Sequence, residues 1–370
     1  MKGFTRLAVG GAVALGLTLC AGLASAEGEL KVYNWAEYIG EDTISNFEKE
    51  YDVKVTYDNY DSVETADAKL LAGNTGYDVV SHAGSAISRL IPAGVLMPLD
   101  KSKLPNFSHI RPEIMKQLNT WDPGNQYIVP YMWGTAGVTY NEEMVKSVLP
   151  DATFDSLDLI FKPENMEKLA ECGVSFLDSP TDIIPMALAY MGLDPNSTNP
   201  DDYKAVEEML AQVRPYIKTF DNYAYQKMPE REFCVAVTWG PDGLLAMSGA
   251  EEANTGVVLN FMLPPGQGAA NLWVDGWVIP ADAKNVENAL LFLNYMMRPE
   301  VAAEDSNYTW YATANKDAVP LVDPAVTSNE AAYPTEAQVE LMYTGVPLPP
   351  KVERVRTRAW TNFKSGSMGG

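Results

Sequence analysis

Three tryptophans of the chain each lie two or three residues before a carboxylate. The pairs are Trp35 with Glu37, Trp239 with Asp242, and Trp273 with Asp275. An indole face attracts a cation through its quadrupole, and a carboxylate accepts the charge-assisted hydrogen bonds of an ammonium group. If these pairs meet in one cleft, they predict a slender organic polycation as the ligand, with apolar carbons between its charges.

A fourth pair, Trp121 with Asp122, is followed by Pro123 and Gly124 and is typical of a turn, so we assign it to structure. Large aromatic side chains usually fill protein cores, and packing is the simpler interpretation of any single pair. The other three pairs therefore depend on where the fold places them.

Short strand and helix patterns alternate through the first part of the chain. Strands are expected at residues 30–33, 53–57 and 77–80, and helices at 43–50, 62–72 and 85–90. This alternation predicts an α/β fold with parallel strands. Ligands of such sheets bind beyond the carboxyl ends of the strands, where Trp35, Ser85 and Trp239 are expected.

Two later segments bear on the same site. Residues 129–140 are extended and interrupted by Pro and Gly, and they are predicted to cross between two lobes. Residues 271–279 are β-prone but contain Asp275 and Gly276. An acid within such a strand needs a partner if it is buried. That partner is either a ligand cation or an arginine or lysine of the chain.

The first 26 residues are predicted to be an export signal. Lys2 and Arg6 give a basic start, residues 7–19 are apolar, and residues 24–26 are small, as at a cleavage site. The apolar run is short for a membrane span. Because Leu19 precedes Cys20 where a lipidation signal prefers a small residue, we expect cleavage near Ala26 and release into the periplasm.

Removal of that signal leaves Cys172 and Cys234, and two cysteines in an exported chain predict one disulfide. It would close a loop of about 60 residues and stabilise the fold by about 4 kcal/mol. Two unpaired buried thiols are the alternative. Loss of Lys2 and Arg6 takes the net charge from −22 to −24, which disfavours nucleic acids and anionic membranes as partners.

Enzyme signatures are missing from the sequence. His82 and His109 are the two histidines, and there is no HExxH pair, nucleophile elbow or phosphate-binding loop. Ser81 and His82 are neighbours on an expected extended segment, so their side chains should point to opposite faces. We therefore expect no enzyme, no cofactor and no metal, although Tyr57 and Tyr60 leave an iron-binding interpretation open.

Six stretches in the same order are spread over essentially the whole mature chain, namely residues 32–39, 94–105, 130–135, 172–178, 280–285 and 355–360. Together they resemble the bacterial periplasmic polyamine-binding proteins of the putrescine/spermidine type, which serve ABC transporters. The resemblance implies a monomeric solute-binding protein with a polyamine as ligand and a membrane permease as partner, and no nucleic acid.

The same resemblance implies an α/β, two-lobed periplasmic-binding-protein fold of type II, with the ligand cleft between the lobes. Residues 27–134 and 258–308 would form lobe 1, and residues 135–257 and 309–370 would form lobe 2. It also implies that Cys172 pairs with Cys234. The implied aromatic walls of the cleft are Trp35, Tyr38, Trp239, Trp273 and Tyr311. The implied polar residues are the acids Asp182, Asp242 and Asp275, with Glu37 close by and Ser85 in a contact loop.

Several residues depart from the putrescine-binding pattern. Ala36 and Ala83 stand where serines are common, and His82 replaces a proline. Asp182 is shorter than the usual glutamate, whereas Glu37 and Trp273 are more similar to the spermidine branch. These departures favour spermidine over strict putrescine selectivity. Binding of another solute (an amino acid, a sugar or iron) is the alternative function, and an exported enzyme using Ser81 or His82 is a third.

Overall fold

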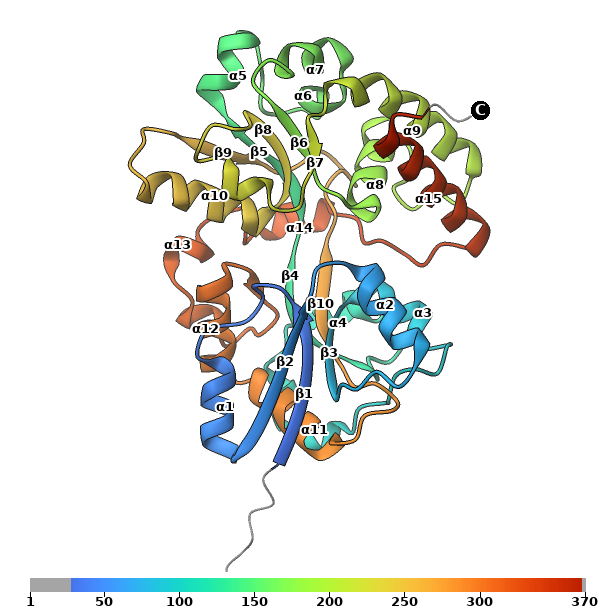
Figure 1. The fold of residues 1–370 in the computed structure, drawn as a ribbon, viewed down its shortest axis with the longest axis vertical. Helices are drawn as coiled ribbons and strands as arrows, with labels where there is room; N and C mark the ends of the chain where they lie inside the picture. Colours follow the sequence, from blue (N-terminus) through green and yellow to red (C-terminus); the bar gives the residue numbers. More distant parts are fainter. Residues whose placement is uncertain (1–27, 368–370) are drawn as a thin grey trace, which may run out of the picture.

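Two β-sheets organise residues 28–367, the part of the chain that this computed structural model describes (Figure 1). The first sheet has the strand order β11–β4–β10–β3–β1–β2. Its strands are β1 (Gly28–Trp35), β2 (Val53–Tyr60), β3 (Val79–Ala83), β4 (Ile128–Gly134), β10 (Trp273–Val278) and β11 (Ala312–Thr313). We call this sheet and its helices the lower lobe, after its place in Figure 1.

The second sheet has the order β7–β6–β8–β5–β9 and, with its helices, forms the upper lobe. Its strands are β5 (Ala136–Asn141), β6 (Val174–Phe176), β7 (Thr219–Phe220), β8 (Val235–Trp239) and β9 (Leu259–Met262). The disulfide between Cys172 and Cys234 joins the segments that enter β6 and β8, with the two Cα atoms 5.5 Å apart. The predicted pairing is therefore confirmed.

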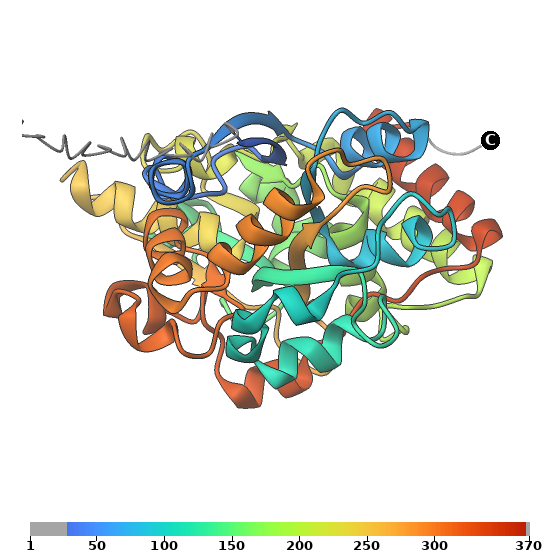
Figure 2. The same ribbon diagram turned by 90° about the horizontal axis from the view of Figure 1, so that it is seen from below.

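Helices cover both faces of the lower sheet (Figure 2). Successive residues of a strand point to opposite faces, so Val32 joins a core that includes Phe292, while Tyr33 joins a second core that includes Leu118. The helices of this lobe are α1 (Thr43–Tyr51), α2 (Val63–Ala72), α3 (Gly84–Leu90), α4 (Pro112–Leu118), α11 (Val286–Met296) and α12 (Pro299–Thr309).

The largest core of the upper lobe includes the fully buried Phe176 and Phe161, and a smaller cluster beside α10 includes Phe233 and Ala246. The helices of this lobe are α5 (Glu142–Val148), α6 (Asp158–Phe161), α7 (Pro163–Leu169), α8 (Pro180–Tyr190), α9 (Pro200–Val213), α10 (Gly240–Glu252) and α15 (Pro350–Ser365). Two short helices, α13 (Pro324–Thr327) and α14 (Glu336–Leu341), precede α15. Within the described residues, no helix has the length and hydrophobicity needed to cross a bilayer.

The chain changes sheet at three places. Thr135 separates β4 of the lower sheet from β5 of the upper sheet, as the predicted crossing at residues 129–140 requires. The second change lies between β9 and β10, and the third lies between β11 and α15. Because backbone pairing puts β9 in the upper sheet and keeps both β11 and Asn315 in the lower lobe, we propose lobe boundaries after Met262 and between Asn315 and α15. The predicted boundaries lay at 257/258 and 308/309.

The early helices and strands lie close to where the sequence placed them. The Ser62 side chain caps α2 by accepting from the Thr65 N–H, and Gly73 ends that helix with φ of 68°. The expectation of parallel strands is right for β1, β2 and β3 but wrong for β10 and β11, which run antiparallel to β3 and β4. The reason is that β10 enters the lower sheet from the upper lobe. The predicted export signal lies outside the described residues.

Candidate functional site

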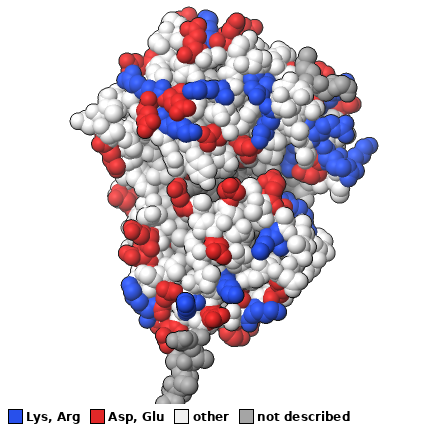
Figure 3. All heavy atoms as spheres, viewed as in Figure 1, with Lys and Arg blue, Asp and Glu red and all other residues white. Residues whose placement is uncertain are grey.

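Strand ends of the two sheets face each other at the junction of the lobes. In the lower sheet, β1 ends at Trp35, and Asp275 of β10 pairs with Ala83 at the end of β3. In the upper sheet, β8 ends at Trp239, directly before α10. Figure 3 shows acidic side chains above and below the hollow between the two halves. We call this region the seam.

Trp35 and Trp273 form half-buried aromatic surfaces on the lower side of the seam. Trp35 packs on Tyr60 with ring centroids 4.4 Å apart, and Trp273 packs on Tyr311 at 5.8 Å. The Nε1 atoms of both indoles are buried and have no hydrogen-bond partner among the described residues. A Cβ atom at Gly134 would lie 2.5 Å from the Trp273 ring, so only glycine lets this indole lie across β4.

Asp275 lies at a bulge in β10, between Val274 and Gly276, where the register against β4 shifts. Burial raises the pKa of its carboxyl to about 7; the nearby Asp182 charge raises it further, and the Tyr38 hydroxyl acts in the opposite direction. No arginine or lysine of the described chain forms an ion pair with Asp275. The protein therefore supplies no cation for this carboxylate.

Asp242 lies in the first turn of α10 and connects the two lobes. Its Oδ1 accepts a hydrogen bond of 2.8 Å from the Tyr311 hydroxyl, which follows α12 of the lower lobe. Burial raises the pKa of Asp242 to about 7, the Tyr311 bond lowers it, and the charge of Glu37 adds to the rise. The Tyr311 ring also packs edge-on against Tyr38 at 4.9 Å.

Asp182 lies at the start of α8 and is held by neutral donors. It accepts hydrogen bonds from Ser179 Oγ at 2.6 Å, Trp239 Nε1 at 3.3 Å and Asn271 Nδ2 at 2.5 Å. Burial raises the pKa of Asp182 above its usual value of 3.8. Asn271 also accepts from the Ala136 N–H at 2.8 Å, so Asp182 is tied to two of the chain crossings.

Glu37 is exposed at the edge of the seam and has a positive φ of 55°. Its Oε2 accepts a 3.4 Å hydrogen bond from the Tyr225 hydroxyl of the upper lobe. Tyr225 and Asn271 are seam residues that the sequence prediction missed, since neither belongs to a tryptophan–acid pair or to the quoted motifs. Apart from Ser85 and Trp35, every predicted site residue is linked to another by a hydrogen bond, a ring contact or its electrostatic effect. Trp35 is connected through Tyr60, whose ring it contacts and whose pKa the charge of Asp275 raises.

Ser85 is exposed near the start of α3, and no hydrogen bond joins its side chain to the other predicted residues. The pair Trp121 and Asp122 is structural, as expected. The Trp121 indole donates to the Gly345 carbonyl at 2.6 Å, and Asp122 accepts from the N–H groups of Tyr127 and Ile128.

The geometry of Ser81 and His82 excludes them as a nucleophile and its base. His82 Nε2 lies 3.0 Å from Asp67, and its Nδ1 accepts the Ala83 N–H at 2.9 Å, so neither ring nitrogen is available to Ser81. The buried Ser81 hydroxyl has no partner within the described residues. Throughout residues 28–367, no group of His, Cys, Asp or Glu side chains is arranged to hold a metal ion.

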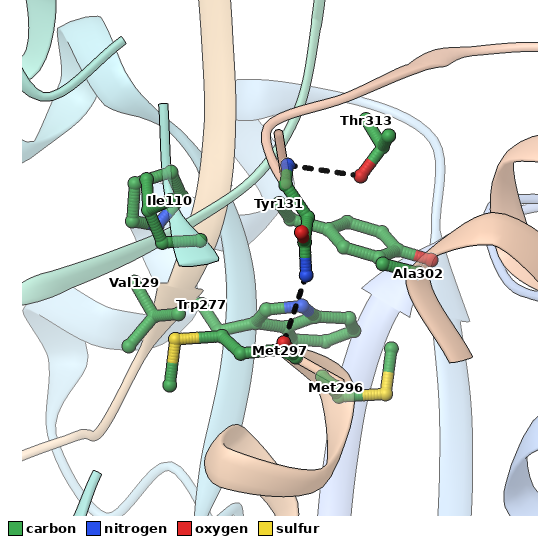
Figure 4. A pocket seen from close by; sticks show the side chains of 10 residues that line it. Ile110, Val129, Tyr131, Trp277, Met296, Met297, Ala302 and Thr313 are labelled. Atoms are coloured by element: carbon green, nitrogen blue, oxygen red, sulfur yellow. Dashed lines mark hydrogen bonds between the residues drawn. The ribbon is translucent and has the colours of Figure 1, made fainter. Parts of the chain in front are cut away.

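A small cavity lies below the seam, in the lower lobe. Its volume is about 10 Å³, about the room that one water molecule needs. Tyr131, Trp277, Met296 and Met297 are among the residues that line it (Figure 4). It is too small for an organic ligand, so we assign it to packing.

Comparisons with known proteins match this geometry. Residues 42–335 match the family described as bacterial extracellular solute-binding protein. The putrescine-binding periplasmic protein SpuD of Pseudomonas aeruginosa is 45% identical, with 96% of this chain and 98% of SpuD covered. The putrescine-binding periplasmic protein PotF of Escherichia coli is also 45% identical, with 93% of each chain covered.

A solved structure gives the same fold. The spermidine/putrescine ABC transporter substrate-binding protein PotD of Streptococcus pneumoniae superimposes with a TM-score of 0.77 and 27% identity, covering 92% of this chain and 100% of that one. The expected two-lobed α/β fold of periplasmic binding proteins is therefore confirmed.

Proposed function

The chain belongs to the family of bacterial extracellular solute-binding proteins, and from this premise we propose that it captures polyamines in the periplasm and delivers them to an ABC importer. The captured ligand is putrescine, spermidine or both. The protein acts by binding and release, without making or breaking a covalent bond. Its partners are the polyamine and the membrane permease of the transporter.

One observation carries this proposal: the seam holds carboxylates from both lobes, and none of them forms an ion pair with a lysine or arginine of the described chain. Asp275 comes from the lower lobe, and Asp182 and Asp242 come from the upper lobe. Their hydrogen-bond donors are uncharged, and the one charge of the chain that lowers the pKa of any of them is that of Arg356, which acts on Asp182. An unpaired buried charge is costly. Ammonium groups that enter the seam would remove this cost, while an amino acid or a sugar would bring a carboxylate or no charge at all.

The aromatic residues of the seam suit the rest of such a ligand. We propose that Trp35, Tyr38, Trp239, Trp273 and Tyr311 pack along the methylene chain. Asp182, Asp242 and Asp275 would bind the ammonium groups, with Glu37 and Ser85 at the edge. Indoles attract cations as well as apolar carbons, so a single wall serves both parts of the molecule.

Closure of the lobes couples ligand capture to delivery. A ligand shifts a two-state equilibrium only by its difference in affinity for the two states. Because the acids come from both lobes, an amine that touches all of them binds the closed form better than an open one. The closed protein is then the form that the permease recognises.

The predicted export signal and the oligomeric state belong to the same proposal. A signal that is cleaved near Ala26 accounts for delivery to the periplasm, and we propose that the released protein is a monomer with no nucleic-acid partner. A mass spectrum of protein purified from the periplasm tests the cleavage site, and light scattering tests the monomer.

A thermal-shift panel tests the proposed ligand class. Putrescine and spermidine should each raise the melting temperature, since a ligand at about one hundred times its Kd stabilises by roughly 2.7 kcal/mol. Arginine, glucose and ferric ion should leave the melting temperature unchanged. A shift by one of these three without a shift by either polyamine would replace the proposal with binding of that solute.

A second measurement compares the affinities for the two polyamines. The relatives that are 45% identical are named for putrescine, whereas Glu37 and Trp273 resemble the spermidine branch at the site itself. We propose that the site residues decide, and that spermidine binds at least as tightly as putrescine. Isothermal titration calorimetry with both amines measures the ratio.

A further inference from the structure

One face of the upper lobe has a charge opposite to that of the whole molecule. The chain carries a net charge of −22, yet α15 contains five basic residues and a single acid, Glu353. Lys351, Arg354 and Arg358 are spaced three and four residues apart, so they lie on one face of the helix. All three are exposed, and Figure 3 shows basic atoms gathered on this side of the upper lobe.

These charges are unused by the rest of the structure. Within the described residues, Lys351, Arg354, Arg358 and Lys204 of the adjacent α9 form no ion pair. The two other basic residues of α15 are engaged, because Arg356 pairs with Glu353 and Lys364 pairs with Asp178. We call Lys204, Lys351, Arg354 and Arg358 the basic stripe.

The stripe borders a groove of about 540 Å³ between α9 and α15. Lys204 and Arg358 line the groove together with Arg214, and Glu207 and Glu208 line it as well. Arg214 is held in place by donating to the carbonyls of Lys364 and Ile217 at 3.0 and 3.3 Å. The groove is therefore a concave surface with mixed charges and an excess of positive ones.

A polyamine does not fit this surface, because the stripe would repel it. A bilayer fits poorly too. The large apolar residues of α15, Trp360 and Phe363, are buried in the core of the lobe, so the helix offers no exposed anchor of the kind that interfacial helices use. The net charge of the molecule also opposes approach to anionic lipid.

We propose that the basic stripe and its groove dock an acidic segment of the transporter's membrane permease; this inference rests on the proposed function. Complementary charges steer association and fix orientation more than they add affinity. The stripe lies on exposed positions of α9 and α15, both in the upper lobe, so closure of the lobes does not change its own arrangement and its contribution is the same for the empty and the loaded protein. The stripe therefore determines how readily the protein associates with the permease, whereas closure of the lobes determines whether transport follows.

The test compares two variants with equal changes of charge. Arg354→Glu/Arg358→Glu reverses two charges of the stripe. The control, Lys49→Glu/Lys54→Glu, reverses two exposed charges on α1 and β2, at the opposite end of the lower lobe (Figure 1). Each is titrated against the permease complex in proteoliposomes, and the spermidine-dependent ATPase rate is recorded at two salt concentrations.

We expect the stripe variant to need about tenfold more protein for half-maximal rate, to keep the maximal rate and to lose most of its salt dependence. The control should match the unmodified protein, and both variants should bind spermidine normally in calorimetry. Equal half-maximal concentrations for all three proteins, or equal losses in both variants, would overturn the docking proposal. Loss of cosedimentation with phosphatidylglycerol vesicles in the stripe variant alone would instead assign the stripe to lipid and overturn it too. Absence of polyamine binding in the unmodified protein would refute the proposed function, a separate result.

Discussion

Asp78 and Asp275 are two buried or half-buried carboxylates of the lower lobe with opposite surroundings. Asp78 accepts from the backbone N–H groups of Lys31, Lys284 and Asn285 and from the Asn285 side chain, at 2.8 to 3.0 Å. Asp275 has no comparable set of donors among the described residues, where the neutral Tyr38 hydroxyl is the one group whose hydrogen bonding lowers its pKa. The hydrogen-bonding capacity of Asp78 is filled by its own chain, whereas Asp275 can still accept hydrogen bonds from a ligand.

The number of hydrogen-bond donors that the protein supplies distinguishes structural acids from ligand-binding acids better than burial does. A buried carboxylate that is fully hydrogen-bonded stabilises the fold that supplies its donors. A carboxylate with a raised pKa and no cation partner costs stability when ionised, and its persistence points to a ligand. Asp242 is of the second kind, since among the described residues only the neutral Tyr311 hydroxyl donates a hydrogen bond to its side chain.

The largest effect on binding is expected from Asp275→Asn. Removing this charge should weaken spermidine binding by roughly 2–5 kcal/mol, as for breaking a buried charge pair. The empty protein should be no less stable, since the substitution also removes a charge that burial disfavours. Calorimetry and chemical denaturation measure the two quantities. An unchanged affinity would remove Asp275 from the site.

Asp78→Asn should give the converse result. Hydrogen bonds to a charged group contribute about 1.5–3 kcal/mol each, and the new amide NH₂ would face backbone donors. We expect the free energy of unfolding to fall by about 3 kcal/mol, with spermidine affinity unchanged for the protein that remains folded. A loss of affinity equal to that of Asp275→Asn would contradict the assignment of Asp78 to structure and Asp275 to ligand binding.

Much of this distinction was open to sequence reasoning, and part of it was not. Asp275 was singled out because an acid interrupts a β-prone segment, and no lysine or arginine within residues 28–367 forms an ion pair with it. The helix predicted at residues 62–72 differs from α2 only by the N-cap residue Ser62, since Ser62 and Gly73 mark the ends of the helix by local chemistry. Signals of this kind act over a few residues, and a single sequence contains them in full.

Contacts between distant segments were the part that sequence left out. Tyr225 and Glu37 are 188 residues apart, and Asn271 and Asp182 are 89 apart. No local sequence pattern marks Tyr225 or Asn271 for these hydrogen bonds, because their partners are brought close only when the lobes meet. For the same reason, the sequence did not predict that β10 runs antiparallel to β3. It also did not predict the sheets to which β9 and β11 belong.

Two seam acids give binding and stability a dependence on pH. Burial raises the pKa of Asp242 and of Asp275 to about 7, so between about pH 4 and 7 the folded empty protein keeps protons that the unfolded chain has released. Their contribution to stability is therefore fully present below about pH 4 and is lost as the pH rises through about 7. Ligand binding has the opposite sign, because ammonium groups require ionised carboxylates.

We therefore expect the Kd for spermidine to fall as the pH rises from 5.5 to 8, by up to about tenfold per pH unit for each acid below pH 7. Calorimetry at pH 6 in two buffers of different ionisation enthalpy counts the protons released, and up to two are expected. Asp275→Asn should release one fewer. Binding without any proton release at pH 6 would show that these acids are already ionised in the empty protein.

The smallest effect is expected from Trp273→Leu, and it extends the comparison from acids to aromatics. Trp277, four residues along β10, is fully buried in the lower core, whereas Trp273 is half-buried at the seam. Loss of the indole at 273 should weaken binding by roughly 1–2 kcal/mol through lost cation–π contact. Spermidine should lose more than putrescine, because it has a third ammonium to place against the aromatic wall. Trp277→Leu is the matched control and should lower the free energy of unfolding with little change in affinity. Equal losses for the two amines on Trp273→Leu would assign the choice of amine to the spacing of the acids instead.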